Sequence, residues 1–578
     1  MIVEEPNLHA NALRVLQSRY LLREQDNRAA ETPGGLFRRV AQAVAQAELQ
    51  YGGDAESCAD IFFTLMNDLL FLPNSPTLMN AGMERQQLSA CFVLPVDDSI
   101  DSIFTTLRQA ALIHQSGGGT GLNFSKIRPA GDPLGPEPGR ATGPLSFIKI
   151  FDAATDKIRQ GGKRRGANMG ILDITHPDIA AFITAKKEPG TITNFNLSVG
   201  ITDAFMRAVE ANTSWSLLHP ASGNVAQEIP ARELWNLLAE MAWESGDPGI
   251  VFLDRIEEAN PVPAAGRINC TNPCGEVPLL PFEACNLGSV NLAKMILREN
   301  DRWKIDWNKL ETTVKTAIRF LDDVIDVNAY ILPQTETVVK ANRKIGLGVM
   351  GWADLLMRLR IPYASDEAVA LGKKLMQFIR EKSHEASAAL AAERGVFPNW
   401  PESKYYPGTR MRNATCTAIA PTGTISVIAG ASSSIEPVFA LAFRREHALG
   451  GADLEEINPV FAETLGEMGI AYEDISTHVM QEGTLAGTAL PPEIKQVFLT
   501  AYEIDPSRHL LHQSVFQQFT DNAVSKTINL PAKTTVAETG AIFMQAWKLG
   551  LKGITVFREG SRGQVVLRPG ISCKVCST

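Results

Sequence analysis

Residues 272–276 of the chain read NPCGE, and a second cysteine, Cys285, follows the central Cys274 by eleven residues. In an extended segment the side chains alternate between two faces, so Asn272, Cys274 and Glu276 would point together into one pocket. A thiol, a carboxylate and a carboxamide placed side by side are typical of chemistry on a hydroxylated substrate. A turn with a buried thiol is the alternative, because free cysteine is among the most buried residue types.

The composition indicates a large globular protein. Of its 578 residues, 45% are hydrophobic and 21% are charged, and the length suggests several domains. The net charge of -9 argues against direct nucleic-acid binding, which needs broad positive surface, but it leaves room for a local nucleotide pocket. The sequence shows no secretory signal and no run of about 18 apolar residues, so we expect a cytoplasmic protein without a membrane span.

Cysteine usage favours redox chemistry. In a chain of this kind the eight cysteines are expected to be reduced, catalytic or redox-active rather than structural disulfides. Cys91, taken alone, is expected to be a buried core thiol. Cys573 and Cys576 form a CxxC pair, which suits a dithiol relay or half of a zinc site. The relay is favoured because no further zinc ligands lie nearby in the sequence.

Hydrophobic periodicity divides the chain into three parts. Residues 1–70 are expected to be a helical region, residues 71–560 an α/β domain, and residues 561–578 a flexible tail. Four helices can be predicted: one that starts at Thr32 and Pro33, one from a Ser57 cap to Leu70, one over Leu310 to Val327, and a long one from a Ser365 cap to Gly395.

Three segments are rich in glycine or hydroxyl groups. They are SGGGTGLNFSKIRP (116–129), RQGGKRRGANMG (159–170) and APTGTIS (420–426). Glycines let the backbone approach a ligand closely, and exposed amides together with Lys163, Arg164 and Arg165 suit phosphate groups. Packing turns, a solvated basic loop and an ordinary helix cap are the alternatives.

Taken together and in order, eight stretches resemble the ribonucleotide reductases, specifically the dimeric adenosylcobalamin-dependent (class II) kind. They are SPTLMNAG (75–82), SACFVLPVDDS (89–99), SGGGTGLNFSKIRP (116–129), GGKRRGANMGIL (161–172), NPCGEVPLLPFEACNLGSVNL (272–292), RKIGLGVMGWADLL (343–356), PTGTIS (421–426) and LKGITVFREGSR (551–562). The resemblance covers most of the chain, from about Phe71 to Arg562.

The resemblance implies a fold and a set of catalytic roles. The fold is an α/β barrel of ten strands in two five-stranded halves, with a central finger loop. Cys274 at the fingertip would become a thiyl radical and remove hydrogen from the 3′ carbon of the ribose. Glu276 would take the proton of the 3′ hydroxyl, and Asn272 would hydrogen-bond the substrate hydroxyls. Cys91 and Cys285 would reduce the substrate as water leaves from the 2′ position, ending as a disulfide.

Electron supply follows from the same resemblance. Cys573 and Cys576 would reduce the active-site disulfide and receive electrons from a thioredoxin-like protein. Many relatives have longer tails with more cysteines.

The resemblance also assigns binding residues. The substrate-binding set is Ser75, Thr77, Ser89, Ala90, Gly119, Thr422, Gly423, Thr424, Ile425 and Ser426, with the hydroxyl-rich loops holding the phosphates. The set that binds the effector, a deoxyribonucleoside triphosphate or ATP, is Asp98, Arg128, Arg159, Gln160, Lys163 and Arg164, with Gln160 and Arg164 as base readers. In the family this site is built at a dimer interface, so the resemblance implies a homodimer.

The expected radical source rests on motifs that the sequence lacks. Where the iron-dependent class has a tyrosine pair, this chain reads GITVFREG (553–560), and it has no RVCGY-like glycyl-radical segment. Adenosylcobalamin is therefore the expected cofactor, without a protein metal site. The alternatives are the catalytic subunit of an iron-dependent reductase with a separate radical-generating subunit, and a nucleotide-binding paralogue without activity. The substrate is expected to be a ribonucleoside diphosphate, with a triphosphate as the open alternative.

Overall fold

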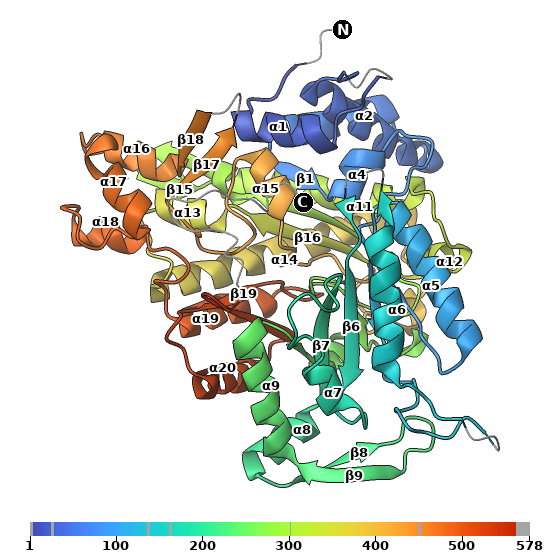
Figure 1. Cartoon of the computed structure of the whole chain (residues 1–578). Helices are drawn as coiled ribbons and strands as arrows, with labels where there is room; N and C mark the ends of the chain where they lie inside the picture. Colours follow the sequence, from blue (N-terminus) through green and yellow to red (C-terminus); the bar gives the residue numbers. More distant parts are fainter. Residues whose placement is uncertain are drawn as a thin grey trace.

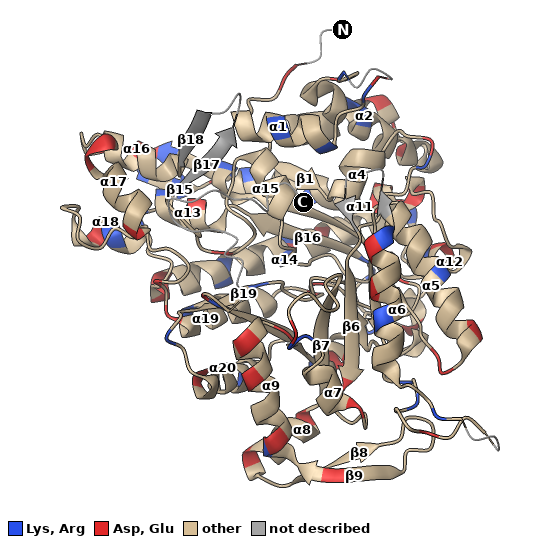
Figure 2. Cartoon of the chain, in the orientation of Figure 1, with Lys and Arg blue, Asp and Glu red and all other residues tan. Residues whose placement is uncertain are grey.

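The computed structural model describes residues 4–24, 28–135, 139–160, 164–300, 302–448 and 452–561. A strand barrel lies at the centre and helices surround it (Figure 1). Charged residues lie almost entirely outside the barrel strands, and a strand such as β6 (Asn168–Asp173) is almost uncharged (Figure 2). This distribution is expected for strands that are covered on both faces.

Five parallel strands form the first half of the barrel. Each pairs with the next in the order β2 (Cys91–Leu94), β3 (Gly119–Asn123), β6, β7 (Phe195–Ile201) and β10 (Gly249–Phe252). Parallel neighbours need long crossover connections. Helices α5 (Ile100–Gln115), α6 (Pro144–Lys157) and α9 (Ala231–Ser245) lie within these connections.

The second half also has five parallel strands. β13 (Ala284–Asn291) pairs with β16 (Ile345–Met350), and β19 (Thr527–Leu530) pairs with β20 (Gly553–Arg558). Two single bridges, Leu347 to Thr417 and Ile419 to Val524, insert the 417–419 segment between β16 and the chain that leads into β19.

Two antiparallel contacts close the barrel. β13 pairs with β2 at one junction, and β20 pairs with β10 at the other. The predicted barrel of ten strands in two five-stranded halves is therefore confirmed. A short extra strand, β1 (Phe71–Pro73), lies antiparallel on β13.

A short hairpin runs inside the barrel as the predicted finger loop. Its strands β11 (Cys270–Thr271) and β12 (Pro278–Leu279) pair antiparallel. β3 passes so close that a Cβ on Gly121 would lie 1.9 Å from the Thr271 carbonyl oxygen, which explains the glycine. The Asn196 side chain donates to the Pro273 carbonyl at 2.8 Å, and the Ala523 amide donates to the Glu276 carbonyl at 2.8 Å. Both barrel halves thus hold the loop.

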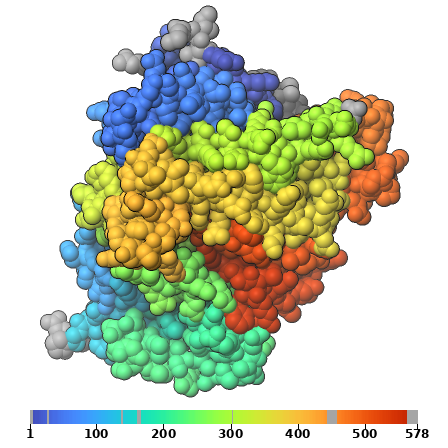
Figure 3. All heavy atoms as spheres, turned by 180° about the vertical axis from the view of Figure 1, so that it is seen from behind, coloured from blue at the N-terminus to red at the C-terminus, as the bar shows by residue number. Residues whose placement is uncertain are grey.

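The N-terminal residues form the helices that the sequence predicts. These are α1 (Ala10–Arg19), α2 (Pro33–Ala45), the 3-10 helix η1 (Gln46–Tyr51) and α3 (Ala55–Asn67). Thr32 caps α2 by accepting from the Gly35 amide, as predicted. The predicted cap of the third helix was wrong, because Asp54 rather than Ser57 accepts the first-turn amides and the helix begins at Ala55. Figure 3 shows these residues packed against segments near residue 300.

Two long helices cover the second half of the barrel. α11 (Trp307–Val327) begins three residues before the predicted Leu310, because Asp306 caps it by accepting from the Lys309 amide. α14 (Asp366–Arg394) begins after its Ser365 cap and ends at Gly395, as predicted.

A buried ionic cluster ties the N-terminal helices to α11 and α14. Glu48 accepts hydrogen bonds from Arg319 at 2.6 Å and from Arg394 at 2.7 Å. Asp322 accepts from Arg343 at 2.8 Å. The carboxylates and Arg394 are almost fully shielded from solvent, so each charge depends on its partners.

The remaining elements lie mainly around the barrel ends. The helices are α4 (Ser75–Asn80), α7 (Ile179–Ile183), α8 (Asp203–Ala211), α10 (Leu253–Ala259), α12 (Pro333–Asn342), α13 (Trp352–Arg358), α15 (Gly423–Ala429), α16 (Pro459–Glu467), α17 (Glu473–Glu482), α18 (Pro492–Val497), α19 (Pro506–Gln517) and α20 (Val536–Lys548), with 3-10 turns η2 (Pro263–Ala265), η3 (Leu292–Lys294) and η4 (Trp400–Glu402). The outer hairpins are β4–β5 (Arg159–Gln160, Arg164–Arg165), β8–β9 (Ser214–Leu218, Val225–Pro230), β14–β15 (Ile296–Glu299, Arg302–Ile305) and β17–β18 (Ala442–Ala448, Ala452–Ile457). None of the helices in the described part of the chain combines the length and apolar character needed to cross a bilayer.

Candidate active site

The NPCGE motif forms the turn of the finger loop rather than an extended segment. The antiparallel pairing of β11 with β12 forces the chain to reverse, and Gly275 adopts a left-handed φ of 82° in this turn. The predicted alternation of faces was therefore wrong: Asn272 and Glu276 are buried, whereas Cys274 is exposed at the tip. The alternative prediction of a turn is confirmed, but the thiol of Cys274 is exposed rather than buried.

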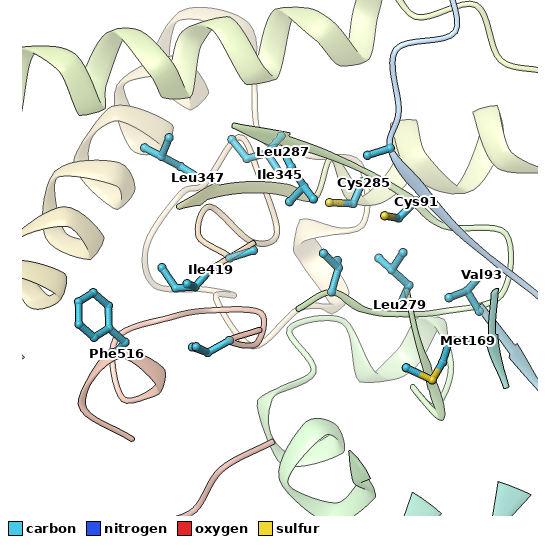
Figure 4. Close-up of a cluster of buried hydrophobic side chains, with 14 of the residues drawn as sticks. Cys91, Val93, Met169, Leu279, Cys285, Leu287, Ile345, Leu347, Ile419 and Phe516 are labelled. Atoms are coloured by element: carbon cyan, nitrogen blue, oxygen red, sulfur yellow. The ribbon is translucent and has the colours of Figure 1, made fainter. Parts of the chain in front are cut away.

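Cys91 and Cys285 lie opposite each other across the β2–β13 junction of the barrel. They are direct Cα partners in the antiparallel register, and both side chains are buried. Figure 4 shows the two sulfur atoms next to each other. Burial raises the pKa of the Cys285 thiol well above its usual value, and nearby Cys91 and Glu276 raise it further. Cys285 therefore stays protonated and can supply hydrogen.

Asn272 connects the finger loop to this cysteine pair. Its Nδ2 donates to the sulfur of Cys91 at 3.3 Å, and its Oδ1 accepts from the Val277 amide at 3.0 Å. Glu276 is 2% exposed and lies close enough to Cys285 to influence that thiol electrostatically. The structure thus brings together Asn272, Glu276, Cys91 and Cys285.

Three of the predicted substrate residues, Ser89, Ala90 and Gly119, lie beside the cysteine pair and the finger loop. The Gly119 amide donates to the Ala90 carbonyl at 3.0 Å, and the Ala90 amide donates to the Cys285 carbonyl at 3.2 Å. The Ser89 hydroxyl lies 3.1 Å from the Asn286 carboxamide oxygen. A Cβ on Gly119 would meet the Pro273 ring at 2.9 Å, so this glycine admits the fingertip.

Ser75 and Thr77 lie on α4, close to the N-terminal helices. The Ser75 hydroxyl lies 2.7 Å from the Tyr20 hydroxyl. Thr77 is 1% exposed and donates to the Leu88 carbonyl at 3.0 Å, so its hydroxyl ties α4 to the chain that precedes β2.

The 422–426 segment forms the start of α15, against which α1 packs. Thr422 has a left-handed φ of 58°, and its hydroxyl oxygen accepts from the Ser434 amide at 2.7 Å. Ser426 and Ile425 are buried, whereas Gly423 is exposed and Thr424 is half-buried. The accessible groups of this loop are therefore those of residues 423 and 424.

Two predicted effector residues contact each other. Arg128 donates to Asp98 through its guanidinium at 2.7 Å and through its backbone amide at 3.1 Å. The backbones of Gln160 and Arg164 pair in the β4–β5 hairpin. The side chains of Arg159, Gln160 and Arg164, together with all of Lys163, Cys573 and Cys576, lie outside the described residues.

A cavity of about 350 Å³ opens beside the fingertip. Cys274 lines it together with residues of β7, β10 and β20 and of the 524–527 segment. Its polar lining includes Glu436, Gln513 and Lys526, none of which the sequence motifs identified. A sequence signal existed for Lys526, because it interrupts the uncharged run AVSKTINL (523–530).

Family models match nearly the whole chain. The ribonucleotide reductase barrel domain matches residues 89–411 and 408–557, and the ribonucleotide reductase all-alpha domain matches residues 7–86. These matches agree with the barrel, the finger loop and the cysteines described above. The chain therefore belongs to the ribonucleotide reductase family.

Particular relatives are similar over most of their length. A vitamin B12-dependent ribonucleoside-diphosphate reductase of Mycobacterium tuberculosis is 50% identical over 97% of this chain and 81% of its own length. A protein of the same description from Thermoplasma acidophilum is 46% identical over 98% of this chain and 81% of its own. The class Id ribonucleotide reductase alpha subunit of Actinobacillus ureae superposes with a TM-score of 0.80 at 26% identity, covering 96% of this chain and 99% of that structure.

Proposed function

We propose that this chain is an adenosylcobalamin-dependent ribonucleoside-diphosphate reductase. The single observation that carries the proposal is the position of the finger loop inside the barrel: its Cys274 lines a cavity, and its Asn272 donates to Cys91 of the buried Cys91 and Cys285 pair. The names of the relatives that are 46% and 50% identical support the cofactor and the diphosphate substrate.

The fingertip residues act on the 3′ position of the ribose. Cys274, as a thiyl radical, takes the 3′ hydrogen atom and later returns one. Glu276 accepts the proton of the 3′ hydroxyl, and Asn272 orients the substrate hydroxyls. Asn272 and Glu276 are buried, so bulk water does not compete for their hydrogen bonds to the ribose.

The buried cysteine pair supplies the reducing equivalents. Replacement of the 2′ hydroxyl by hydrogen, with release of water, requires two electrons and two protons, and two thiols provide both as they become a disulfide. Cys573 and Cys576 exchange with this disulfide and are themselves reduced by a thioredoxin-like protein. The division of the chain at residues 70 and 560 and a cytoplasmic location are part of this proposal.

The cavity beside Cys274 suits the adenosyl part of the cofactor. Its wall includes Gly246, Gly249, Gly275 and Gly553, so at these positions backbone rather than a side chain borders the space. Adenosylcobalamin, when bound, supplies a carbon-centred radical that can oxidise a thiol. Residues of β7, β10 and β20 would hold this part of the cofactor.

The remaining predicted residues bind nucleotides. Ser75, Thr77, Ser89, Ala90, Gly119 and residues 422–426 bind the substrate, and the accessibility of Gly423 and Thr424 supports a phosphate site there.

The effector site and the dimer belong to the same part of the molecule. Asp98, Arg128, Arg159, Gln160, Lys163 and Arg164 bind the effector triphosphate. The nearby helices expose apolar side chains: Ile100 and Phe104 on α5 are 64% and 47% exposed, and Ile150 on α6 is 39% exposed. Such a patch supports a homodimer whose interface includes these helices.

The test is deoxyribonucleotide formation by the purified chain. The mixture holds adenosylcobalamin, a ribonucleoside diphosphate, an effector triphosphate and dithiothreitol, without iron or a second protein. Product that disappears in Cys274→Ala, while nucleotide affinity is kept, is the expected result. Activity only after addition of a metal-bearing subunit would overturn the cobalamin assignment and favour the iron-dependent alternative.

A further inference from the structure

A buried ion pair forms one polar corner of the cavity beside Cys274. Lys526 and Glu436 both line this cavity and are joined by a hydrogen bond between the ammonium and a carboxylate oxygen. The lysine side chain is 0% exposed, whereas that of the glutamate is 26% exposed. The ammonium group of Lys526 is therefore shielded from solvent, and the carboxylate of Glu436 is the member of the pair that a ligand can reach.

The three donors of Lys526 are all used within the protein. Besides Glu436, the ammonium donates to the Thr527 carbonyl at 3.0 Å and to His509 Nδ1 at 3.1 Å. His509 can accept at Nδ1 because its Nε2 donates to the Ala501 carbonyl at 3.0 Å. Burial and the charge of Lys526 lower the pKa of His509 well below its usual value, which agrees with a neutral ring. Lys526 thus has no donor left for a ligand.

Glu436 retains capacity to accept. One carboxylate oxygen accepts from Lys526 and the other from the Thr527 amide at 2.8 Å. A carboxylate offers about four lone-pair sites, so about two remain for a ligand. A group that binds at this corner must therefore donate hydrogen bonds, as hydroxyl groups do.

Gln513 adds a second acceptor to the cavity lining. Its Nε2 donates to the Gly553 carbonyl at 2.9 Å, which fixes the orientation of the amide. Its Oε1 has no hydrogen-bond partner among the residues that the structure describes, although the side chain is 1% exposed. Both polar side chains thus favour a ligand rich in donors.

The cavity volume limits which part of the cofactor can reach Glu436. About 350 Å³ is near the lower end of the range of small-molecule sites, about 300–1,000 Å³. A nucleoside fits into such a space, whereas a whole corrinoid does not. The nucleoside arm of the cofactor carries two neighbouring ribose hydroxyls, which are the donors that a carboxylate accepts in pairs.

We propose that Glu436, held by Lys526, accepts hydrogen bonds from the ribose hydroxyls of the cofactor's adenosyl group and so positions that group beside Cys274. This inference rests on the proposed function. It assigns Glu436 to recognition of the nucleoside arm and Lys526 to orienting the carboxylate. Binding of the corrin ring itself should not depend on Glu436.

The test compares the affinities of two corrinoids by equilibrium dialysis, without turnover. Adenosylcobalamin carries the nucleoside and methylcobalamin lacks it. Glu436→Gln should weaken the binding of adenosylcobalamin about tenfold, because a hydrogen bond to a charged group is replaced by one to a neutral amide. The affinity for methylcobalamin should be unchanged. Glu381→Gln on the exposed face of α14 is the matched control, and it should change neither affinity.

A cofactor analogue with a 2′-deoxyribose in the adenosyl group makes the test sharper. Wild type should bind this analogue more weakly than adenosylcobalamin, and Glu436→Gln should add little further loss, because the two changes remove the same contact. If Glu436→Gln does not fold, as judged by thermal unfolding, Glu436→Asp takes its place.

The outcomes separate this inference from the proposed function. Equal weakening of both corrinoids, or no change in either, would overturn the role of Glu436 while leaving the cobalamin enzyme intact. A wild-type chain that binds no corrinoid would overturn the proposed function, and this inference with it.

Discussion

Cys91 and Cys285 are direct Cα partners in the antiparallel pairing of β2 with β13. Directly opposed residues in such a ladder have Cα atoms about 4.5–5.5 Å apart, within the range that a disulfide spans. The two sulfurs can therefore form a bond without movement of either strand. This relationship supports the pair as the reductant, because the oxidised and reduced states share one backbone.

The pair predicts the stoichiometry of a single turnover. A pre-reduced Cys573→Ser/Cys576→Ser variant without added reductant should lose two thiols for each deoxyribonucleotide formed. Peptide mass spectrometry should locate the disulfide between Cys91 and Cys285, because the tail pair can no longer exchange with it. Cys91→Ser and Cys285→Ser should each abolish product. Cys416→Ala is the control, because Cys416 is buried in the 415–417 segment and should leave the stoichiometry unchanged. A disulfide found elsewhere, with both serine variants active, would refute this role.

The close contact between Gly121 and the finger loop can be tested by adding a methyl group at Gly121. A methyl group there would lie 1.9 Å from the Thr271 carbonyl oxygen, so Gly121→Ala must displace the loop that carries Cys274. We expect a loss of about 1–3 kcal/mol in the free energy of unfolding and a larger relative loss of turnover. Urea denaturation and the reductase assay measure the two effects.

Gly466→Ala is the matched control, because nothing lies within 4 Å of the added Cβ and the residue is in helix α16. It should leave turnover unchanged and add up to about 1 kcal/mol of stability. Full activity in Gly121→Ala would mean that the loop tolerates displacement, contrary to the prediction.

The barrel could be predicted from the sequence because several local motifs together resemble one family. The same motifs pointed to Cys91, Cys274, Glu276 and Cys285, whose catalytic roles stay predictions. Ser365 and Thr32 could be read as caps from one or two residues each. The NPCGE turn could not be read in this way, since its shape depends on the pairing of Cys270 with Leu279 inside the barrel.

Long-range structure also explains what the motifs missed. Glu436 and Lys526 are 90 residues apart in the chain and meet only at the cavity wall. A single acidic residue in ASSSIEPVF (431–439) carries no periodic or spacing signal. Residues whose role depends on such distant contacts become visible only in the folded chain.

The exposed apolar patch on α5 predicts the oligomeric state. Phe104 is 47% exposed, and a charge at this position would be buried without a partner if the helix forms an interface. Phe104→Asp should shift the protein from dimer to monomer in sedimentation velocity and weaken effector binding. Ile61→Asp on α3 is the control, because Ile61 is similarly exposed, at 55%, and lies on the N-terminal helices. A dimer that persists in Phe104→Asp would exclude α5 from the interface.

Protonation of Glu48 should account for part of the loss of folding stability at low pH. Burial alone would raise its pKa, but hydrogen bonds from Arg319 and Asp323 and the charge of Arg394 lower it from 4.5 to about 2. A carboxyl group with a depressed pKa stabilises the folded state above about pH 4.5, and this contribution is lost as the pH falls toward 2. Urea unfolding between pH 6 and pH 3 should therefore show a smaller decrease in Glu48→Gln than in wild type. Equal pH dependence of the two proteins would contradict the assignment.

Replacement of Glu276, the proposed general base, should lower the turnover rate. Its carboxylate is 2% exposed beside the Cys91 and Cys285 pair, and Glu276→Gln keeps its size while removing its ability to accept a proton. General-base catalysis contributes about 10²–10⁴-fold to a rate, so kcat should fall by at least about 100-fold. Affinity for the ribonucleoside diphosphate should change little, because the amide can still form a hydrogen bond to the 3′ hydroxyl. Equal losses in kcat and in substrate affinity would instead mean that Glu276 only shapes the pocket, since a base acts in the transition state and not in binding.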